Sequence, residues 1–285
     1  MKYKYFKKEG IIDPGKDKAL DFLYNKAFGR FILKIIYNTW VSKFVGFVLN
    51  RRISCLSIKK YVRNNDIDLS LYEDRKYKSF NDFFTRKLKK MNKNSDKKDF
   101  VANCDCKISV YEINDKLILN VKKSKYNVEE LIQDKELAKE YKDGLCIVYR
   151  LEPSNYHRYI FVDDGKMLEH KVIKGKLHTV NPIVYDKYQV FTENTREVSV
   201  LETENFGKIV QIEVGALCVG KIKNNYPEKF KRYDEKGYFE FGGSTIIHLI
   251  KNVDLDKELF DNTNNNIETR VSVGDIIGKA KKWFK

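Results

Sequence analysis

A serine near the C-terminus follows two consecutive glycines and opens an apolar, β-branched run. The stretch over 241–245 reads Phe-Gly-Gly-Ser-Thr and continues as Ile-Ile-His-Leu-Ile. Gly-Gly before Ser-Thr is typical of a turn that enters a strand. Glycine also leaves the backbone bare, so the stretch can bring the Ser244 hydroxyl against a neighbouring carbonyl carbon. The stretch alone leaves both interpretations open.

Two further residues can complete a nucleophilic site with Ser244. His157 lies in NYHRYIFVDDG, an aromatic strand that ends in a turn, and Asp105 lies between two cysteines in NCDCKISV. Taken separately, each is more typical of a structural role: a histidine satisfied within a strand, and a turn aspartate. Taken together, the three supply a nucleophile, a base and a group that orients the base.

Other kinds of site have no support in the sequence. The four histidines, His157, His170, His178 and His248, show no HExxH spacing, and no cluster of His, Cys and carboxylates predicts a metal centre. No GxGxxG or P-loop sequence predicts a nucleotide cofactor. The five cysteines, an odd number without a CxxC pair, favour a reducing compartment over a disulfide framework. The N-terminus lacks the continuous apolar core of a secretory signal.

The composition is that of a folded chain with a basic surface. Of the 285 residues 42% are hydrophobic, and 55 Lys and Arg against 40 Asp and Glu give a formal charge of +15. This length suits one large domain or two small ones. A basic surface attracts phosphate, either of nucleic acid or of an anionic lipid surface. No nucleic-acid reader motif accompanies the charge, so we expect no nucleic-acid partner.

The N-terminal third has a helical pattern. Residues 18–62 repeat apolar positions at spacings of three and four, with lysines and arginines between them, which predicts amphipathic helices. Lys34 and Lys43 interrupt the most apolar part, so the pattern does not predict a membrane-spanning helix. Such helices either pack on the body of the protein or lie in a membrane interface.

The rest of the chain has a strand-rich pattern. A short helix with a serine cap is predicted over 77–90, and a charged, polar segment at 91–99 marks a boundary. Short β-branched or aromatic runs then alternate with Gly, Asn and Asp, interrupted by one predicted helix over 127–141. We therefore predict an α+β fold, with N-terminal amphipathic helices over 1–95 followed by a β-rich domain over 96–285.

Five short motifs resemble, in their order along the chain, those of the bacterial phosphatidylserine decarboxylase family. They are FNDFFTRKLK, NYHRYIF, HTVNP, FTENTREVSVLETENFGKIVQIEVGALCVGKI and GGST. Each motif is weak alone, but their order and compatible spacing extend the resemblance over nearly the whole chain. The resemblance implies an enzyme, a carboxy-lyase that converts phosphatidylserine to phosphatidylethanolamine, with the β-rich region as its catalytic domain.

The resemblance also implies how such an enzyme becomes active. In this family the proenzyme cuts itself before a serine, which places the cleavage between Gly243 and Ser244. The products would be a β chain of residues 1–243 and an α chain of residues 244–285. Ser244 would become a pyruvoyl group, which forms a Schiff base with the substrate amine and replaces any other cofactor. No metal or nucleotide is then expected.

The catalytic residues implied by the resemblance are Asp105, His157 and Ser244. His157 would take the proton of the serine and later donate a proton to the substrate, and the Asp105 carboxylate would orient it and stabilise its charge. Many relatives carry a second histidine where this chain has Ile160. His178, in the HTVNP motif, is the candidate accessory residue for that role.

Partners and location follow from the same resemblance. The lipid substrate favours a membrane interface for the helices over 18–62, so we expect peripheral binding to an anionic lipid surface at the cytoplasmic face of the cell membrane. The β and α chains of one precursor would stay together, and a homodimer is left open. The alternative function is that of a catalytically silent family member that binds lipid.

Overall fold

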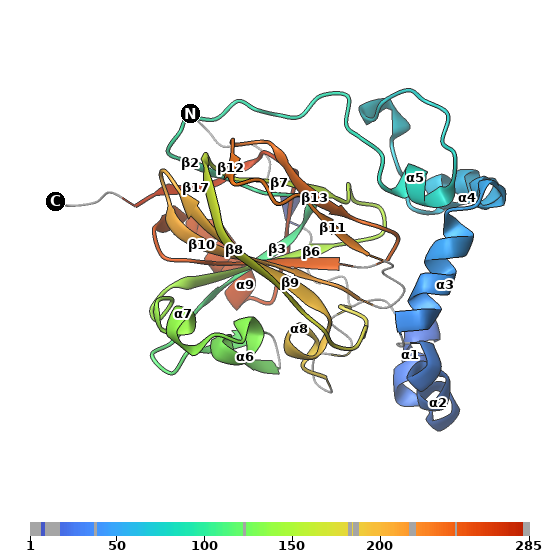
Figure 1. The fold of residues 1–285 in the computed structure, drawn as a ribbon, viewed down its shortest axis with the longest axis horizontal. Helices are drawn as coiled ribbons and strands as arrows, with labels where there is room; N and C mark the ends of the chain where they lie inside the picture. Colours follow the sequence, from blue (N-terminus) through green and yellow to red (C-terminus); the bar gives the residue numbers. More distant parts are fainter. Residues whose placement is uncertain are drawn as a thin grey trace.

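The computed structural model describes most of the chain (Figure 1). The described residues are 7–8, 18–36, 39–121, 124–181, 184, 188–216, 221–242 and 244–281. Helices dominate the N-terminal region and strands dominate the remainder, which confirms the predicted α+β class. Gly243, on one side of the predicted cleavage, lies outside the described residues.

The N-terminal helices form an arm beside the sheets (Figure 1). They are α1 (Lys18–Asn25), α2 (Ala27–Ile36), α3 (Thr39–Leu49), the 3-10 helix η1 (Arg52–Ser57), α4 (Ile58–Asn64), the 3-10 helix η2 (Leu69–Leu71) and α5 (Phe80–Phe84). The helices predicted over 18–62 are therefore present, as a series of short pieces. The Tyr24 hydroxyl accepts a hydrogen bond from the Thr179 N–H at 2.9 Å, so α1 contacts the strand-rich part of the chain.

The helix predicted over 77–90 is shorter than predicted. Its N-cap is confirmed, because the Ser79 hydroxyl accepts a hydrogen bond from the Asp82 N–H at 3.1 Å. The helix ends at Phe84, and Arg86 instead turns its side chain into the protein, where it binds backbone carbonyls. These tertiary contacts outweigh the local helix propensity of the following lysines.

The helix predicted over 127–141 is broken in two. The pieces are α6 (Val128–Ile132) and α7 (Lys135–Lys139). Gln133 between them has a left-handed backbone with φ of 50°. The Asp134 carboxylate then caps the second piece by accepting the Leu137 N–H at 2.9 Å. An N-cap inside the predicted helix explains why the helical pattern does not continue through it.

The largest sheet has nine antiparallel strands. Their order is β1-β16-β3-β6-β14-β10-β9-β8-β12. The bounds are β1 (Lys7–Lys8), β16 (Thr269–Val271), β3 (Cys106–Glu112), β6 (Leu145–Leu151), β14 (Ser244–Ile250), β10 (Gly207–Val214), β9 (Arg196–Thr203), β8 (Gly165–Ile173) and β12 (Lys229–Phe230). The middle strand β14 is buried at every residue, and its short, mostly apolar run is consistent with a strand covered on both faces.

Smaller sheets and helices cover the large sheet (Figure 1). Two three-stranded sheets lie above it in this view, and α6, α7 and α8 lie below it. The smaller elements are β11 (Ile222–Asn224), β13 (Glu235–Phe239) and β7 (Arg158–Ile160); β15 (Val253–Leu255), β17 (Ile276–Ala280) and β2 (Asp99–Val101); β4 (Ile118–Val121) and β5 (Ser124–Asn127); α8 (Val190–Glu193) and α9 (Lys257–Asn264).

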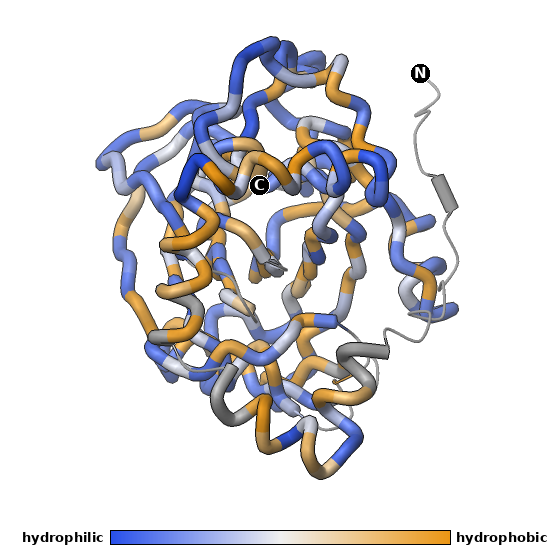
Figure 2. The backbone as a smooth tube through the Cα atoms, turned by 90° about the vertical axis from the view of Figure 1, so that its right-hand side faces the viewer, coloured by the Kyte–Doolittle hydropathy of each residue, from blue (hydrophilic) through white to orange (hydrophobic). Residues whose placement is uncertain are grey.

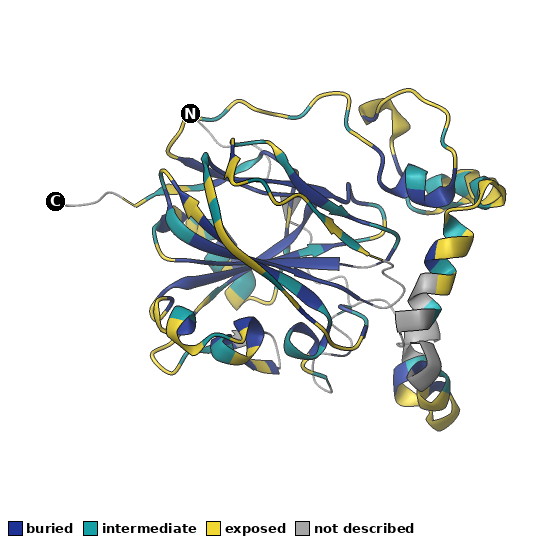
Figure 3. Ribbon diagram, in the orientation of Figure 1, coloured by how far each residue is buried: buried dark blue, intermediate teal, exposed yellow. Residues whose placement is uncertain are grey.

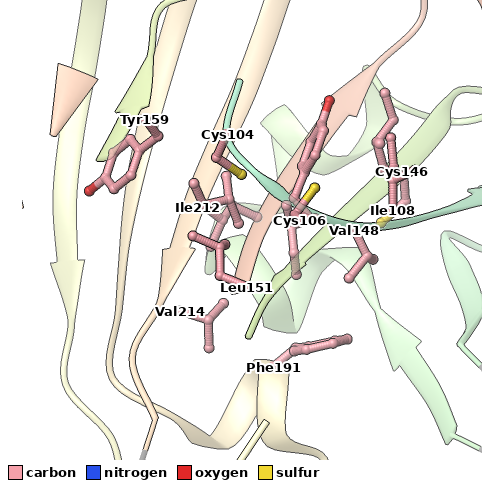
Figure 4. Packing of buried hydrophobic residues seen from close by; sticks show 14 of the residues in the cluster. Cys104, Cys106, Ile108, Cys146, Val148, Leu151, Tyr159, Phe191, Ile212 and Val214 are labelled. Carbon is pink, nitrogen blue, oxygen red and sulfur yellow. The ribbon is translucent and has the colours of Figure 1, made fainter. Parts of the chain in front are cut away.

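The hydrophobic core lies between these layers. Figure 3 shows the middle strands of the large sheet as mostly buried, whereas exposed residues gather on the arm and the outer loops. Figure 4 shows Cys104, Cys106, Leu151 and Ile212 among the side chains of this core, and all four are fully or almost fully buried. The buried cysteines act as small apolar residues, and burial raises the pKa of Cys104 well above its usual range.

Candidate active site

Ser244 is the first residue of the middle strand β14. It pairs with Leu151 of β6, and Thr245 pairs with Val214 of β10 on the other side. The Ser244 side chain is fully buried, and its Oγ has no hydrogen-bond partner among the described residues. Leaving a buried hydroxyl unpaired costs roughly 1–3 kcal/mol, and such an exception calls for a functional explanation.

The backbone just before Ser244 has a conformation suited to glycine. Gly242 has φ of 141°, a region that residues with a side chain rarely adopt. This supports the interpretation that bare backbone is needed where the chain reaches Ser244. Because Gly243 is outside the described residues, the geometry of the predicted scissile bond is not described.

Phe241, three residues before Ser244, is held by α5. Its ring packs against those of Phe80 and Phe84, with ring centroids 5.1 and 5.2 Å away. Its backbone N–H donates a hydrogen bond to the Asn81 side-chain oxygen at 3.1 Å. The N-terminal region therefore fixes the segment that leads to the predicted cleavage.

His157 lies directly before β7, with its ring fully buried and stacked on Phe84 at a centroid distance of 4.0 Å. Its Nε2 is 3.1 Å from the Glu152 carbonyl oxygen, which can only accept, so Nε2 carries the proton and Nδ1 keeps its lone pair. Nδ1 has no hydrogen-bond partner among the described residues. Burial and the charge of Arg86 lower the pKa of His157 to about 3, so the ring is neutral at physiological pH.

The sheet register brings His157 and Ser244 to the same end of β6. Ser244 is directly opposite Leu151, and the next residue of that chain segment, Glu152, binds the His157 ring through its carbonyl oxygen. No hydrogen bond between Ser244 and His157 is present among the described contacts. Their two unpaired atoms, a hydroxyl and an imidazole lone pair, are nevertheless a matched donor and acceptor.

Asp105 contacts the backbone next to His157. Its carboxylate accepts hydrogen bonds from the Val273 N–H, at 2.8 Å, and from the Tyr156 N–H. No bond between this carboxylate and the His157 ring is present among the described contacts. Burial raises the pKa of Asp105 to about 6, although both backbone bonds and the charge of Arg86 act against this rise. The structure therefore links the predicted orienter to the predicted base through the backbone.

Asp105 also lines a polar cavity of about 520 Å³. The turn before His157 contributes Ser154 and Asn155 to its wall, and the C-terminal segment contributes Ser272 and Asp275. Neither Ser244 nor His157 belongs to the lining of this cavity. The carboxylate thus meets an open space on one side and the backbone of the site on the other.

His178 lies in the loop after β8, where the Asn194 side-chain nitrogen donates to its carbonyl oxygen and to that of Gly215, the residue after β10, at 2.8 and 2.7 Å. Its ring stacks on Tyr188 at 4.5 Å, and its Nε2 lies 3.7 Å from the Glu193 carboxylate. It shares no described contact with Ser244 or His157, so its accessory role stays a prediction. Ile160, at the position where the resemblance leads one to expect a second histidine, is buried in β7.

The sequence was compared with known proteins. The model of the family described as phosphatidylserine decarboxylase matches residues 80–279. The chain is 46% identical over 270 residues to phosphatidylserine decarboxylase proenzyme 2 of Clostridium acetobutylicum, with 93% of each chain covered. It is 41% identical over 276 residues to the phosphatidylserine decarboxylase proenzyme of Clostridium botulinum, with 93% of this chain and 94% of the relative covered. The chain belongs to the phosphatidylserine decarboxylase family.

This membership confirms the resemblance drawn from the five motifs, and with it the prediction of a decarboxylase that is made as a proenzyme. A more distant member, the proenzyme of Fusobacterium nucleatum, is 39% identical over 274 residues. Across the described part of the chain, no helix has both the length and the apolar character needed to span a bilayer. Within the same residues, no group of three or more His, Cys, Asp or Glu is arranged to bind a metal ion.

Arg86, in the first family motif, was not predicted as a site residue. Its side chain is fully buried, and one terminal nitrogen donates to the carbonyl oxygens of Ser154 and Asn155 at 3.0 and 3.2 Å. The guanidinium also lies over the Tyr72 ring, 4.3 Å from its centroid. The available signal was an arginine directly after an aromatic helix motif. Arginine is rarely buried among apolar residues unless its side chain has hydrogen-bond partners.

A second missed feature is a buried ion pair near β14. Lys236 and Glu213 are fully buried, with Nζ and Oε1 3.2 Å apart. Gln211 and Asn224 donate to the same carboxylate at 2.7 and 3.1 Å, which satisfies both of its oxygens. Gln211 in turn pairs with the His248 ring at 2.9 Å. This network joins β10, β11, β13 and β14 through buried side chains.

Proposed function

We propose that the chain cleaves itself between Gly243 and Ser244 and that Ser244 becomes a pyruvoyl group. The observation that carries this proposal is the pair of buried, unpaired atoms at one end of the sheet, the Ser244 Oγ and the His157 Nδ1. The lone pair of His157 takes the serine proton while Oγ attacks the Gly243 carbonyl carbon. An ester replaces the peptide bond, and the Ser244 nitrogen becomes a free amine.

Elimination then breaks the ester. A base, for which His157 is the proposed group, removes the α-proton of Ser244, and the Gly243 carboxylate leaves as the new end of the 1–243 chain. The remaining dehydroalanine rearranges to an imine, which water hydrolyses to the pyruvoyl group and ammonia. The sequence of steps consumes one water and needs no oxidant or reductant.

The two chains of this cleavage would stay together through the sheet and through Asp105. β14 belongs to the 244–285 chain and pairs on both sides with strands of the 1–243 chain. Asp105 lies in the 1–243 chain and accepts a hydrogen bond from Val273 of the other. Its proposed role is to fix the Tyr156–His157 backbone against the 244–285 chain, so that base and nucleophile keep one geometry.

We propose phosphatidylserine as the substrate and phosphatidylethanolamine as the product, as the names of the family and of its relatives suggest for them. A pyruvoyl group supplies an electron sink for the electron pair left when an amine-bearing substrate loses carbon dioxide. The Ser244 position fits such a group, because its polar atom is buried and unpaired. His157 is the proposed donor of the replacing proton. The alternative, a silent member that binds lipid, would lack this chemistry.

Cleavage and turnover can be measured together. Wild-type protein, Ser244→Ala and His157→Ala would be separated on a denaturing gel and assayed for carbon dioxide released from phosphatidylserine vesicles. We expect two chains and turnover in the wild type only. A wild type that is cut but releases no carbon dioxide would favour the silent lipid-binding alternative. An uncut wild type that still decarboxylates would contradict the pyruvoyl assignment.

We also propose that the arm docks on an anionic membrane at the cytoplasmic face. Among the described residues, most exposed large apolar side chains lie on this arm, with Ile53 and Leu56 exposed at 72% and 83%. Figure 2, which faces the arm, shows apolar and hydrophilic segments alternating along it. Exposed cationic residues accompany the apolar ones, namely Arg51, Arg52, Lys59, Lys60 and Arg63. Apolar insertion beside cationic side chains is how peripheral proteins bind anionic lipid.

Vesicle binding tests this docking surface. The double variant Ile53→Ser and Leu56→Ser should lose most of its binding to vesicles that contain anionic lipid, and Asn64→Ser, an exposed polar change in the same arm, should bind as the wild type does. Equal binding of the double variant and the wild type would contradict the proposal.

A homodimer is proposed at the edge of β8. The outer neighbour β12 pairs only with the first two residues of β8, and Leu168 and Val172 beyond them are 46% and 55% exposed. A second copy that pairs antiparallel with this edge about a two-fold axis at His170 would set Leu168 opposite Val172 and Glu169 opposite Lys171, in both directions. Apolar positions would then face apolar ones and acids would face bases.

Charge reversal tests this edge. Glu169→Lys or Lys171→Glu would bring like charges together twice, so each should shift the protein toward a monomer in light scattering. The double variant restores opposite charges and should restore the dimer. A monomeric wild type, or a dimer unaffected by either single reversal, would contradict the proposal.

A further inference from the structure

The helix α5 and the two residues after it contact both partners of the proposed cleavage. On one side lies Phe241, which leads to the scissile bond, and on the other lies the turn that carries His157. Their backbones are joined by strand pairing, because Tyr238 pairs with Arg158 and the Phe239 N–H donates to the His157 carbonyl oxygen at 3.0 Å. That pairing does not include Phe241 or the His157 ring, and α5 with the two residues after it contacts both.

Three consecutive residues hold the His157 side. Phe84 stacks on the imidazole, the Thr85 carbonyl accepts the Arg158 Nε–H at 2.7 Å, and Arg86 donates to two carbonyl oxygens of the preceding turn. That turn is closed on itself, because the Asn155 N–H donates to the Glu152 carbonyl oxygen at 2.9 Å. The same Glu152 oxygen accepts the His157 Nε2–H. Contacts that fix this turn therefore also fix the orientation of the His157 ring.

Burial of Arg86 is unfavourable for folding stability, because its charge has no carboxylate partner among the described residues. It is fully buried, its Nε lacks a hydrogen-bond partner, and no carboxylate pairs with it at ion-pair distance among the described residues. Burying a charge that is not paired is unfavourable for stability. Its retained contacts go to carbonyls of the turn and to the Tyr72 hydroxyl, at 3.2 Å.

Asn81 holds the other side. Its side chain is buried, its oxygen accepts the Phe241 N–H at 3.1 Å, and its nitrogen lies 3.3 Å from the Asn50 side-chain oxygen. A strand ladder cannot supply this bond, because Phe241 precedes β14 and follows β13. The amide thus fixes the backbone shortly before the predicted scissile bond.

We propose that Asn81 and Arg86 are positioning residues for self-cleavage, the first for the segment that enters the scissile bond and the second for the turn that aims His157. This inference rests on the proposed function. A short rigid helix joins the two contacts, so it sets the distance between the carbonyl to be attacked and the base. Misplacement by about 1 Å in such a site costs ~10²-fold in rate.

The test compares cleavage rates of freshly synthesised proenzyme. Asn81→Leu removes the acceptor for Phe241, and Arg86→Gln removes the charge and shortens the side chain that reaches the turn. Each should slow cleavage by at least ~10-fold. Asn81→Asp keeps the acceptor, and Arg86→Lys keeps a charged donor, so both should recover part of the rate. The matched control is Arg75→Gln, which changes a neighbour of α5 that touches neither segment and should cleave as the wild type does.

Hydroxylamine separates positioning from folding, because it cuts the ester that forms only when Ser244 has attacked. A positioning defect predicts less hydroxylamine-sensitive material at an unchanged thermal unfolding midpoint. If Asn81→Leu or Arg86→Gln does not fold, the conservative variant decides, and wild-type rates in both Asn81→Asp and Arg86→Lys would overturn the inference. Wild-type rates in the two stronger variants would overturn it as well. An uncut wild type would instead defeat the proposed self-cleavage, and the inference with it.

Discussion

Lowering the pH should slow self-cleavage through Asp105 rather than through His157. Burial raises the pKa of this carboxyl to about 6, whereas burial and the charge of Arg86 lower the pKa of His157 to about 3. Between pH 5 and 8 the histidine therefore stays neutral and able to accept a proton, and only the aspartate of this pair changes its charge. Protonated Asp105 loses acceptor capacity for the Val273 and Tyr156 N–H groups, which loosens the backbone beside His157.

The size of the effect follows from the ionised fraction. With a pKa of about 6, about half of the Asp105 carboxyls are ionised at pH 6 and roughly a tenth at pH 5. If cleavage needs the ionised form, the rate at pH 5 should be about tenfold below the plateau reached near pH 8. Asp105→Asn should cleave slowly and with little dependence on pH.

The assay follows the appearance of the 244–285 chain in freshly synthesised proenzyme between pH 5 and 8. Asp275→Asn is a control with a predicted direction, because the Asp275 charge helps to raise the pKa of Asp105. Removing that charge should move the midpoint of the rate profile to lower pH. Equal wild-type rates at pH 5 and pH 8, or an unchanged pH midpoint in Asp105→Asn, would refute the reasoning.

Three other outcomes are expected. In the uncleaved Ser244→Ala background, Lys236→Met should lower the free energy of unfolding in urea by ~3–5 kcal/mol, since it leaves the Glu213 charge buried without its partner. The additional change Glu213→Leu should restore much of this loss. A Lys236→Met variant as stable as its background would contradict the role given to the buried pair. Gly242→Ala should slow cleavage and lower stability, because its φ of 141° strains any side chain; a wild-type rate on the gel would speak against this. Borohydride with phosphatidylserine should attach a lipid head group to the 244–285 chain, and labelling of the larger chain alone would exclude Ser244 as the reactive group.

Local sequence patterns predicted the elements that form from a continuous apolar run or a regular apolar spacing. The β-branched run after Ser244 predicted a strand, and it is the buried middle strand of the large sheet. The apolar spacing over 18–62 predicted helices, which are present in shorter pieces. The helix over 77–90 ended early because the Arg86 side chain binds a turn distant in sequence, a contact that no local pattern contains.

The site residues show the same division. Ser244 was singled out by its two glycines, His157 and Asp105 were grouped with it by residue type, and the family resemblance assigned their roles. Their geometry depends on sheet register and on α5, so the sequence could not show that Asp105 binds the backbone beside His157 rather than its ring. Nor could it show that Phe241 and His157 both contact α5, since such contacts arise only after the strands have paired.

The mass of the small chain is the most direct test of self-cleavage as the source of the reactive group. Purified wild-type protein, folded and exposed to lipid vesicles, should contain residues 244–285 as a separate chain that is lighter by one ammonia than its serine form and has no free amino terminus. A single uncut polypeptide, or a small chain that begins with an ordinary serine, would contradict the account.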